Sequence, residues 1–174
     1  MSKSRVNINV ESESKWEETT GFVEWKESLS GVLDCVIMKR YPDDNVDAEV
    51  FAEVDLHLID NPEMQELNLK FMQKNSTTNV LSFPQFGVSE IDSALRSGGH
   101  VIGDIFLAYE KIAQESREFE VPFFDRCTHL FVHGVLHLMG MDHVLQPEEE
   151  EMENLEICVL EAFGIKNPYV LWEN

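Results

Sequence analysis

Three histidines within eleven residues constrain this chain more than any other feature, because residues 133–143 read HGVLHLMGMDH. On a helix, His133 and His137 lie one turn apart on the same face, so both rings can reach one metal ion. Gly140 can adopt the left-handed conformation that ends a helix, which turns the chain back and brings His143 to the same ion. The segment therefore predicts a metal site with three imidazole ligands on and just after a helix.

The predicted ligand set favours a catalytic zinc ion. Three protein ligands leave one tetrahedral position open to water, and bound zinc lowers the pKa of that water to about 7. We therefore expect one zinc ion, held by His133, His137 and His143, and assign the catalytic role to the same residues; zinc over nickel is a preference drawn from the imidazole ligands. His129 would lie about 12 Å from His137 along the helix axis. We interpret it as a partly buried residue that supports the site.

The same histidine spacing occurs in metzincin peptidases, whose signature places a glutamate directly after the first histidine. In this chain that position is Gly134, which has no side chain to activate water or to carry a proton to a leaving amine. The metal ligands are kept and the peptidase general base is missing. A metallopeptidase is therefore a disfavoured alternative.

Hydrophobic patterning predicts an α+β fold. Apolar residues alternate in some segments and recur at helical spacing in others, which indicates a mixed sheet of about four strands with packed helices and a zincin-like metal helix. The predicted strands cover residues 5–10, 48–59, 80–83 and 100–108, and the predicted helices cover 16–38, 61–73, 109–119, 122–139 and 148–163. Pro84 favours an edge position for the third strand. We expect residues 85–99 to form a loop.

With glycine at position 134, the histidine segment resembles the YbeY family, whose motif is approximately H-G-x-L-H-L-x-G-y-D-H. The sequences LNLKF at 67–71, TNVLSFP at 78–84 and GDI at 103–105 are similar to further elements of that family, in the same order. The likeness runs from about residue 49 to 163. It implies a metal-dependent, single-strand-specific endoribonuclease that acts in rRNA maturation, including 16S rRNA 3′-end processing, and in ribosome biogenesis.

One departure from the family pattern concerns the substrate side of the site. The family normally has an arginine after the aromatic residue of LNLKF, where a guanidinium can clamp a phosphate, and this chain has Met72. Lys70 and Lys74 are near in sequence, but on a helix each lies about 200° around the axis from position 72. These two lysines, with Ser82 on the predicted edge strand, are the candidate substrate-binding residues; Ser82 can equally belong to a simple sheet edge. A ribosome-assembly factor with a metal site and little catalysis is the main alternative.

Two aspartates are candidates for orienting the ligand histidines, as carboxylates do in many metal sites. Asp104 lies within a predicted strand, where its carboxylate can also cap a neighbouring backbone group. Asp142 directly precedes His143, and formation of the turn would by itself explain it.

Composition bears on partners and location. The formal net charge of −20 repels phosphates, so the 13 lysines and arginines must gather at the cleft or a protein partner must bring the chain to RNA. The second option suits contact with the small ribosomal subunit or its assembly proteins. Three cysteines suit no disulfide framework, the first ten residues lack the apolar run of a signal peptide, and no segment suits a membrane span. We expect a cytoplasmic protein with residues 1–174 in one YbeY-like hydrolase domain.

Overall fold

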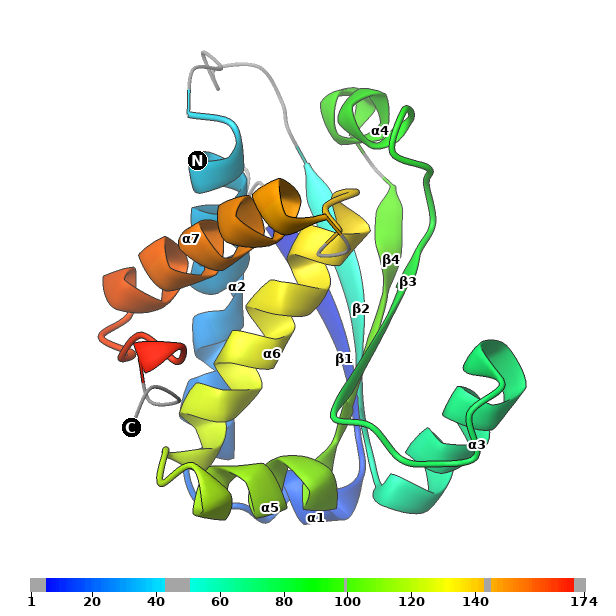
Figure 1. The fold of residues 1–174 in the computed structure, drawn as a ribbon, viewed down its shortest axis with the longest axis vertical. Coiled ribbons are helices and arrows are strands. Elements are labelled where there is room, and N and C mark those ends of the chain that lie inside the picture. The colour runs from blue at the N-terminus through cyan, green and yellow to red at the C-terminus, as the bar shows by residue number, and fades with distance from the viewer. Residues whose placement is uncertain (1–5, 43–50, 99, 143–144, 171–174) are drawn as a thin grey trace.

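The computed structural model of the chain describes residues 6–42, 51–98, 100–142 and 145–170. Strands and helices alternate through these residues (Figure 1). Their bounds are β1 Val6–Ser12, α1 Ser14–Glu17, α2 Phe22–Arg40, β2 Ala52–Ile59, α3 Asn61–Met72, β3 Val80–Pro84, α4 Ile91–Ser97, β4 Val101–Ala108, α5 Tyr109–Glu118, α6 Phe123–Leu138 and α7 Gln146–Ala162.

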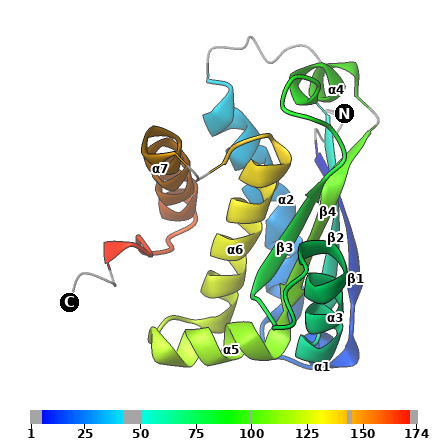
Figure 2. The same cartoon turned by 45° about the vertical axis from the view of Figure 1, so that its right-hand side comes forward.

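The sheet is mixed and has the spatial order β1-β2-β4-β3. Strands β1, β2 and β4 run parallel, and β3 pairs antiparallel with β4 at the edge. The predicted α+β fold with a mixed four-stranded sheet is confirmed, and so is the edge position of the strand that ends at Pro84. Helices α2 and α6 lie on one face of this sheet, and α7 packs outside them (Figure 2).

The burial of β2 shows why the sheet forms where the sequence predicts it. Ala52, Val54, Leu56 and Leu58 are buried, and the residues between them are half-buried. Successive side chains of a strand point to opposite faces, so these four residues line the core side. His57 lies on the other face, where its Nε2 is 2.9 Å from Asp104 Oδ1.

The helix that carries the histidines ends as the sequence predicts. Gly140 has a φ of 86°, in the left-handed region. Its N–H donates to the carbonyl of His137, and the N–H of Met141 donates to the carbonyl of Leu136, both at 3.0 Å. This pair of bonds is a Schellman cap, which satisfies the last carbonyls of α6. His143 lies outside the described residues.

Two element predictions need correction. The segment 85–99, predicted as a loop, contains α4, because Ile91, Ala94 and Leu95 form a buried face at helical spacing. The helix predicted from residue 16 begins instead at Phe22, after Gly21 in the left-handed region with a φ of 91°. The short helix α1 precedes that break.

Helix α3 lies on the opposite side of the sheet from α6 (Figures 1 and 2). It begins as predicted, with the Asp60 carboxylate accepting a hydrogen bond from the backbone of Glu63 at 2.9 Å and Pro62 in the first turn. A small apolar cluster of Ile59, Met64, Leu81 and Ala108 anchors it. None of the helices in the described part of the chain has the length and apolar character needed to cross a bilayer.

Candidate metal centre

Two of the three predicted ligands converge on α6. The Nε2 atoms of His133 and His137 are 3.0 Å apart, and the ring centroids are 4.6 Å apart. Both side chains are half-buried, because the opposite side of this helix packs in the core. The structure therefore brings together the pair that helical spacing predicts.

The other ring nitrogen of each histidine is held by an acceptor. Nδ1 of His137 lies 3.0 Å from the carbonyl oxygen of Met141, and a carbonyl can only accept, so this nitrogen carries the proton. Nδ1 of His133 lies 2.5 Å from Oε1 of Glu156. Burial raises the pKa of Glu156, but its interactions with His129 and His133 outweigh that effect and lower the pKa to about 2. The carboxylate is thus ionised and accepts from His133 Nδ1–H.

This geometry fits a metal ion. With both Nδ1 atoms protonated, each neutral ring presents an Nε2 lone pair toward the other ring. Two such lone pairs repel unless a positive centre binds them, and zinc–nitrogen bonds of about 2.0–2.1 Å at a tetrahedral angle separate two nitrogens by about 3.3 Å. The 3.0 Å between the nitrogens of His133 and His137 is close to that value. The third ligand, His143, stays a prediction.

Glu156 is a functional candidate that the sequence analysis missed. It lies on α7, its side chain is 0% exposed, and besides His133 it accepts a hydrogen bond from the Tyr169 hydroxyl. The signal in the sequence is a carboxylate in the apolar stripe formed by Met152, Val159 and Leu160. A buried carboxylate is rarely tolerated without partners.

His129 sits one turn before His133 and does not join the facing pair. It is 7% exposed, Arg126 Nη1 donates to its Nδ1 at 3.0 Å, and its Nε2 lies 3.6 Å from Glu156 Oε2. Arg126 also forms an ion pair with Glu115 at 2.8 Å. The buried position of His129, beside the ligand helix, agrees with the supporting role that we expected.

Close packing explains the glycine at position 134. A Cβ atom there would lie 2.9 Å from Ser82 Oγ and 3.1 Å from Ile105 Cδ1. The helix thus approaches β3 and β4 so closely that a glutamate has no room. The structure also brings Ser82, a predicted substrate-binding residue, to the ligand helix.

The predicted lysines lie on α3 and just after it. Lys70 is exposed in the last turn of α3, with its Nζ 5.1 Å from the centroid of the Phe71 ring, and Lys74 is exposed just after that helix. Met72 is 43% exposed. Strand β3 runs between α3 and α6 in both views (Figures 1 and 2).

The two predicted orienting aspartates, Asp104 and Asp142, lie in different surroundings. Asp104 Oδ1 lies 2.9 Å from His57 Nε2. Its neighbour Ile105 faces α6, so the alternation of the strand puts Asp104 on the opposite face. Asp104 therefore lies away from His133 and His137, and a role of its carboxylate toward His143 stays a prediction. Asp142 is exposed and follows Met141, and its supporting role stays a prediction.

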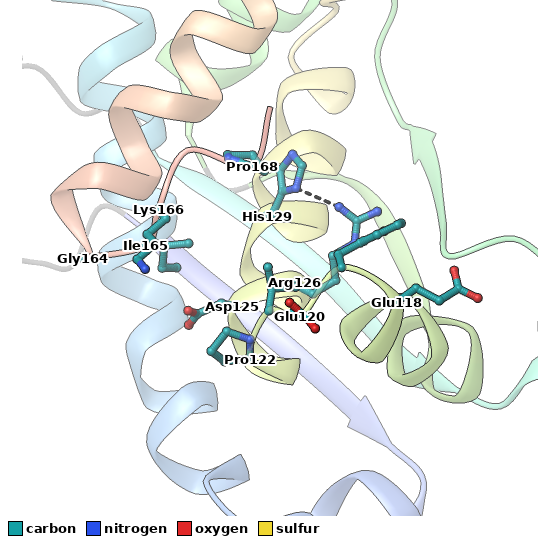
Figure 3. Close-up of a pocket in the computed structure, with 12 residues that line it drawn as sticks. Glu118, Glu120, Pro122, Asp125, Arg126, His129, Gly164, Ile165, Lys166 and Pro168 are labelled. Carbon is teal, nitrogen blue, oxygen red and sulfur yellow. Dashed lines mark hydrogen bonds between the residues drawn. The ribbon is translucent and has the colours of Figure 1, made fainter. Parts of the chain in front are cut away.

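A cavity of about 560 Å³ lies beside Arg126 and His129, between the start of α6 and the segment that follows α7 (Figure 3). Arg126 and His129 reach it from one side, and Ile165 and Lys166 line the other. Its remaining charged lining residues are the acids Glu118, Glu120 and Asp125. Because the lining carries both charges and Arg126 is already paired with Glu115, the cavity has no preference for an anion.

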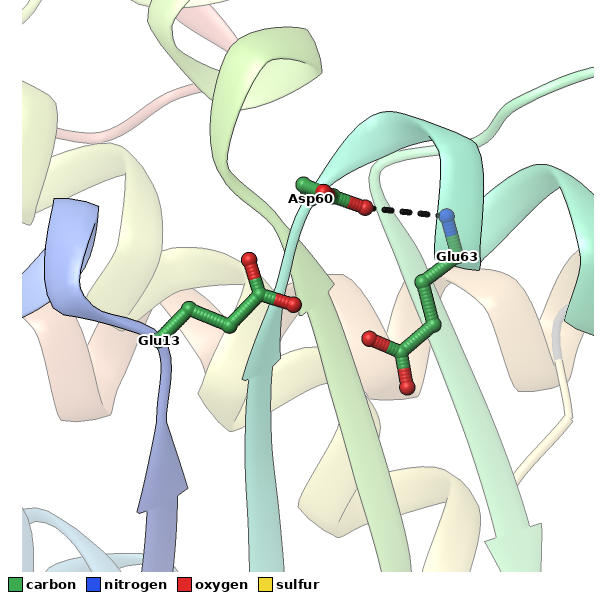
Figure 4. A group of neighbouring side chains, drawn as sticks. All are labelled: Glu13, Asp60 and Glu63. Atoms are coloured by element: carbon green, nitrogen blue, oxygen red, sulfur yellow. Dashed lines mark hydrogen bonds between the residues drawn. The ribbon is translucent and has the colours of Figure 1, made fainter.

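A second group of side chains that could bind a cation consists of three carboxylates. The carboxylates of Glu13, Asp60 and Glu63 lie within 4.8 Å of one another (Figure 4). Asp60 already caps α3 through Glu63 N–H. Burial raises the pKa of Glu13, as do a hydrogen bond with Glu63 and the charge of Asp60. The cap at Asp60 indicates a helix start rather than a metal site.

Comparison with known proteins places these features in a family. The family model described as Endoribonuclease YbeY matches residues 10–164. A protein named Endoribonuclease YbeY from Rhizorhabdus wittichii is 35% identical over 171 residues, which cover 97% of this chain and 99% of the relative. One of the same name from Bartonella bacilliformis is 34% identical, covering 94% and 96% of the two chains.

A solved structure agrees with the fold. The solution structure of a protein from Thermotoga maritima matches with a TM-score of 0.51 at 24% identity and covers 91% of each chain. The sequence matches extend over nearly the whole chain, and they include the histidine helix and its glycine. The chain belongs to the YbeY family of endoribonucleases.

Proposed function

We propose that this chain is a zinc-dependent endoribonuclease that cuts single-stranded RNA during rRNA maturation, including processing of the 16S rRNA 3′ end, and so acts in ribosome biogenesis. The observation that carries the proposal is the facing pair of Nε2 atoms, 3.0 Å apart, in a chain of this family. His133, His137 and His143 would hold the ion. A bound zinc ion supplies Lewis acidity and a water with a lowered pKa.

The other residues of the site would orient the metal ligands and the RNA. The Met141 carbonyl and the Glu156 carboxylate each hold one imidazole with Nε2 directed at the site. Ser82, on the edge strand beside the ligand helix, can donate a hydrogen bond to a phosphate oxygen of an RNA strand lying along β3. Lys70 and Lys74 would meet the RNA backbone farther from the ion, and Asp142 would support the turn before His143.

The setting follows from the charge and the family. With a net charge of −20, the chain needs a protein partner to approach rRNA, and we propose the small ribosomal subunit or its assembly proteins for this role. It would act in the cytoplasm, where ribosomes assemble, with residues 1–174 as one hydrolase domain.

The alternatives are unequal. A metallopeptidase needs a glutamate where the crowded Gly134 stands. An assembly factor with little catalysis draws support from Met72, an exposed thioether at the usual arginine position. A thioether cannot clamp a phosphate or neutralise charge in the transition state.

Cleavage of a single-stranded RNA tests the proposal. Purified wild type, His133→Ala, His57→Ala and Met72→Arg would be compared after the metal content of each has been determined. We expect His133→Ala to abolish cutting and His57→Ala to retain it, because His57 lies on the opposite face of the sheet with Asp104. Met72→Arg should cut faster than wild type, since it restores a phosphate clamp.

Two results would overturn the proposal. Wild type that binds zinc stoichiometrically but, like Met72→Arg, leaves every RNA intact would be an assembly factor. Equal cutting by wild type and His133→Ala would mean that the activity comes from a contaminant or from another site.

A further inference from the structure

A buried carboxylate touches the predicted metal ligand from behind. Glu156 Oε1 lies 2.5 Å from Nδ1 of His133, on the side of the ring away from Nε2. From this geometry we infer that Glu156 is a positioning residue for the metal site, which fixes the tautomer and orientation of His133. The inference rests on the proposed metal-dependent function.

The contacts of Glu156 come from separate parts of the fold. His133 and His129 reach it from α6, and the Tyr169 hydroxyl donates from the segment after α7. Because its side chain is 0% exposed, water does not replace any of these donors. The carboxylate is therefore held in place independently of the histidine that it orients.

The distances rank the partners of Glu156. His133 is at 2.5 Å, whereas His129 is at 3.6 Å, outside hydrogen-bond range. The nearby guanidinium of Arg126 is paired with Glu115 instead. A carboxylate placed only to stabilise the fold would gain more from that guanidinium than from a neutral imidazole.

Charge gives a second argument. Among the described residues, the partners of the Glu156 carboxylate are two imidazoles and a phenol, and none of them is a lysine or an arginine. A buried negative charge needs a compensating positive one. A divalent cation bound at Nε2 of His133 provides it through the ring, and the carboxylate in turn makes the imidazole a stronger donor to the metal.

Metal binding measures this role directly. The affinity of the purified protein for zinc would be determined by competition with a chelator, for wild type, Glu156→Gln and the matched control Glu150→Gln, which alters an exposed glutamate on the same helix. We expect Glu156→Gln to weaken zinc binding about 10–100-fold, the usual effect of removing such a partner, and Glu150→Gln to match wild type. The visible spectrum of the cobalt-substituted proteins should change in the first variant alone.

A second measurement needs no substitution. Nitrogen-15 spectra of the imidazoles in wild-type protein should show the proton of His133 on Nδ1, with and without zinc. Equal zinc affinity of Glu156→Gln and wild type would overturn the inference, and so would a His133 proton on Nε2. If Glu156→Gln does not fold, the His133 tautomer measured in wild-type protein tests the inference. Wild type that binds no zinc would instead refute the metal-dependent function on which the inference rests.

Discussion

The replacement of Gly134 by alanine tests how closely the metal helix approaches the sheet. The added methyl group would lie 2.9 Å from Ser82 Oγ and 3.1 and 3.2 Å from two atoms of Ile105. The serine hydroxyl must rotate to another staggered position to avoid this contact, which costs free energy. Ile105 is 0% exposed and has less freedom, because close-packed neighbours surround it.

Two effects of opposite sign set the magnitude. Alanine is favoured over glycine in a helix interior by about 1 kcal/mol, and overpacking a core costs about 1–3 kcal/mol. We therefore expect Gly134→Ala to lower the free energy of unfolding by up to about 2 kcal/mol. Gly31, an exposed glycine within α2, is the control, because a Cβ there meets only ordinary contacts of 3.6 and 3.7 Å. Gly31→Ala should stabilise by about 0.5–1 kcal/mol.

The assay is urea unfolding of the metal-free proteins followed by tryptophan fluorescence, with the midpoint compared at equal slope. Adding Ser82→Ala to Gly134→Ala removes the shortest contact and should recover about 1 kcal/mol, the coupling typical of side chains in contact. If Gly134→Ala is as stabilising as Gly31→Ala, or if Ser82→Ala recovers nothing, the reasoning from close approach is refuted.

Two further stability predictions use the same unfolding assay. Asp60→Ala removes the side-chain cap of α3 and should cost about 1 kcal/mol, whereas Asp60→Asn, which keeps an acceptor, should cost less. Arg126→Met leaves the buried Glu115 without its cation and should cost about 3–5 kcal/mol, whereas Lys15→Met, which breaks the exposed pair with Glu110, should cost much less. Equal losses in the last two variants would contradict the assigned difference in burial.

Much of the fold could be predicted because its signals are local. The alternation in β2, the cap at Asp60 and the glycine at the end of α6 each depend on a few neighbouring residues. Helix α4 was missed because its apolar face has only three buried members in seven residues, set between glycines and serines. That composition favours a loop when no partner surface is known.

The contacts of the site were harder to predict, because they join segments far apart in the chain. The separation of His133 and His137 follows from helix geometry, but Glu156 lies 23 residues beyond His133 and reaches it only after α7 folds back. The contact of Asp104 was also hard to predict. Ile105 faces α6, so the alternation of β4 directs the Asp104 carboxylate to His57 on the other face of the sheet.

The packing at Gly134 links the fold to the chemistry. A glycine lets α6 approach Ser82 and Ile105, and the same close approach removes the space in which a peptidase glutamate would stand beside the ligands. The hydroxyl of Ser82, a group that can donate to a phosphate, takes that place next to the helix. If Gly134→Ala is destabilising and Ser82→Ala relieves it, the absence of a general base on this helix is a consequence of how the helix meets the sheet. Proton transfer would then have to come from outside the position that metzincins use.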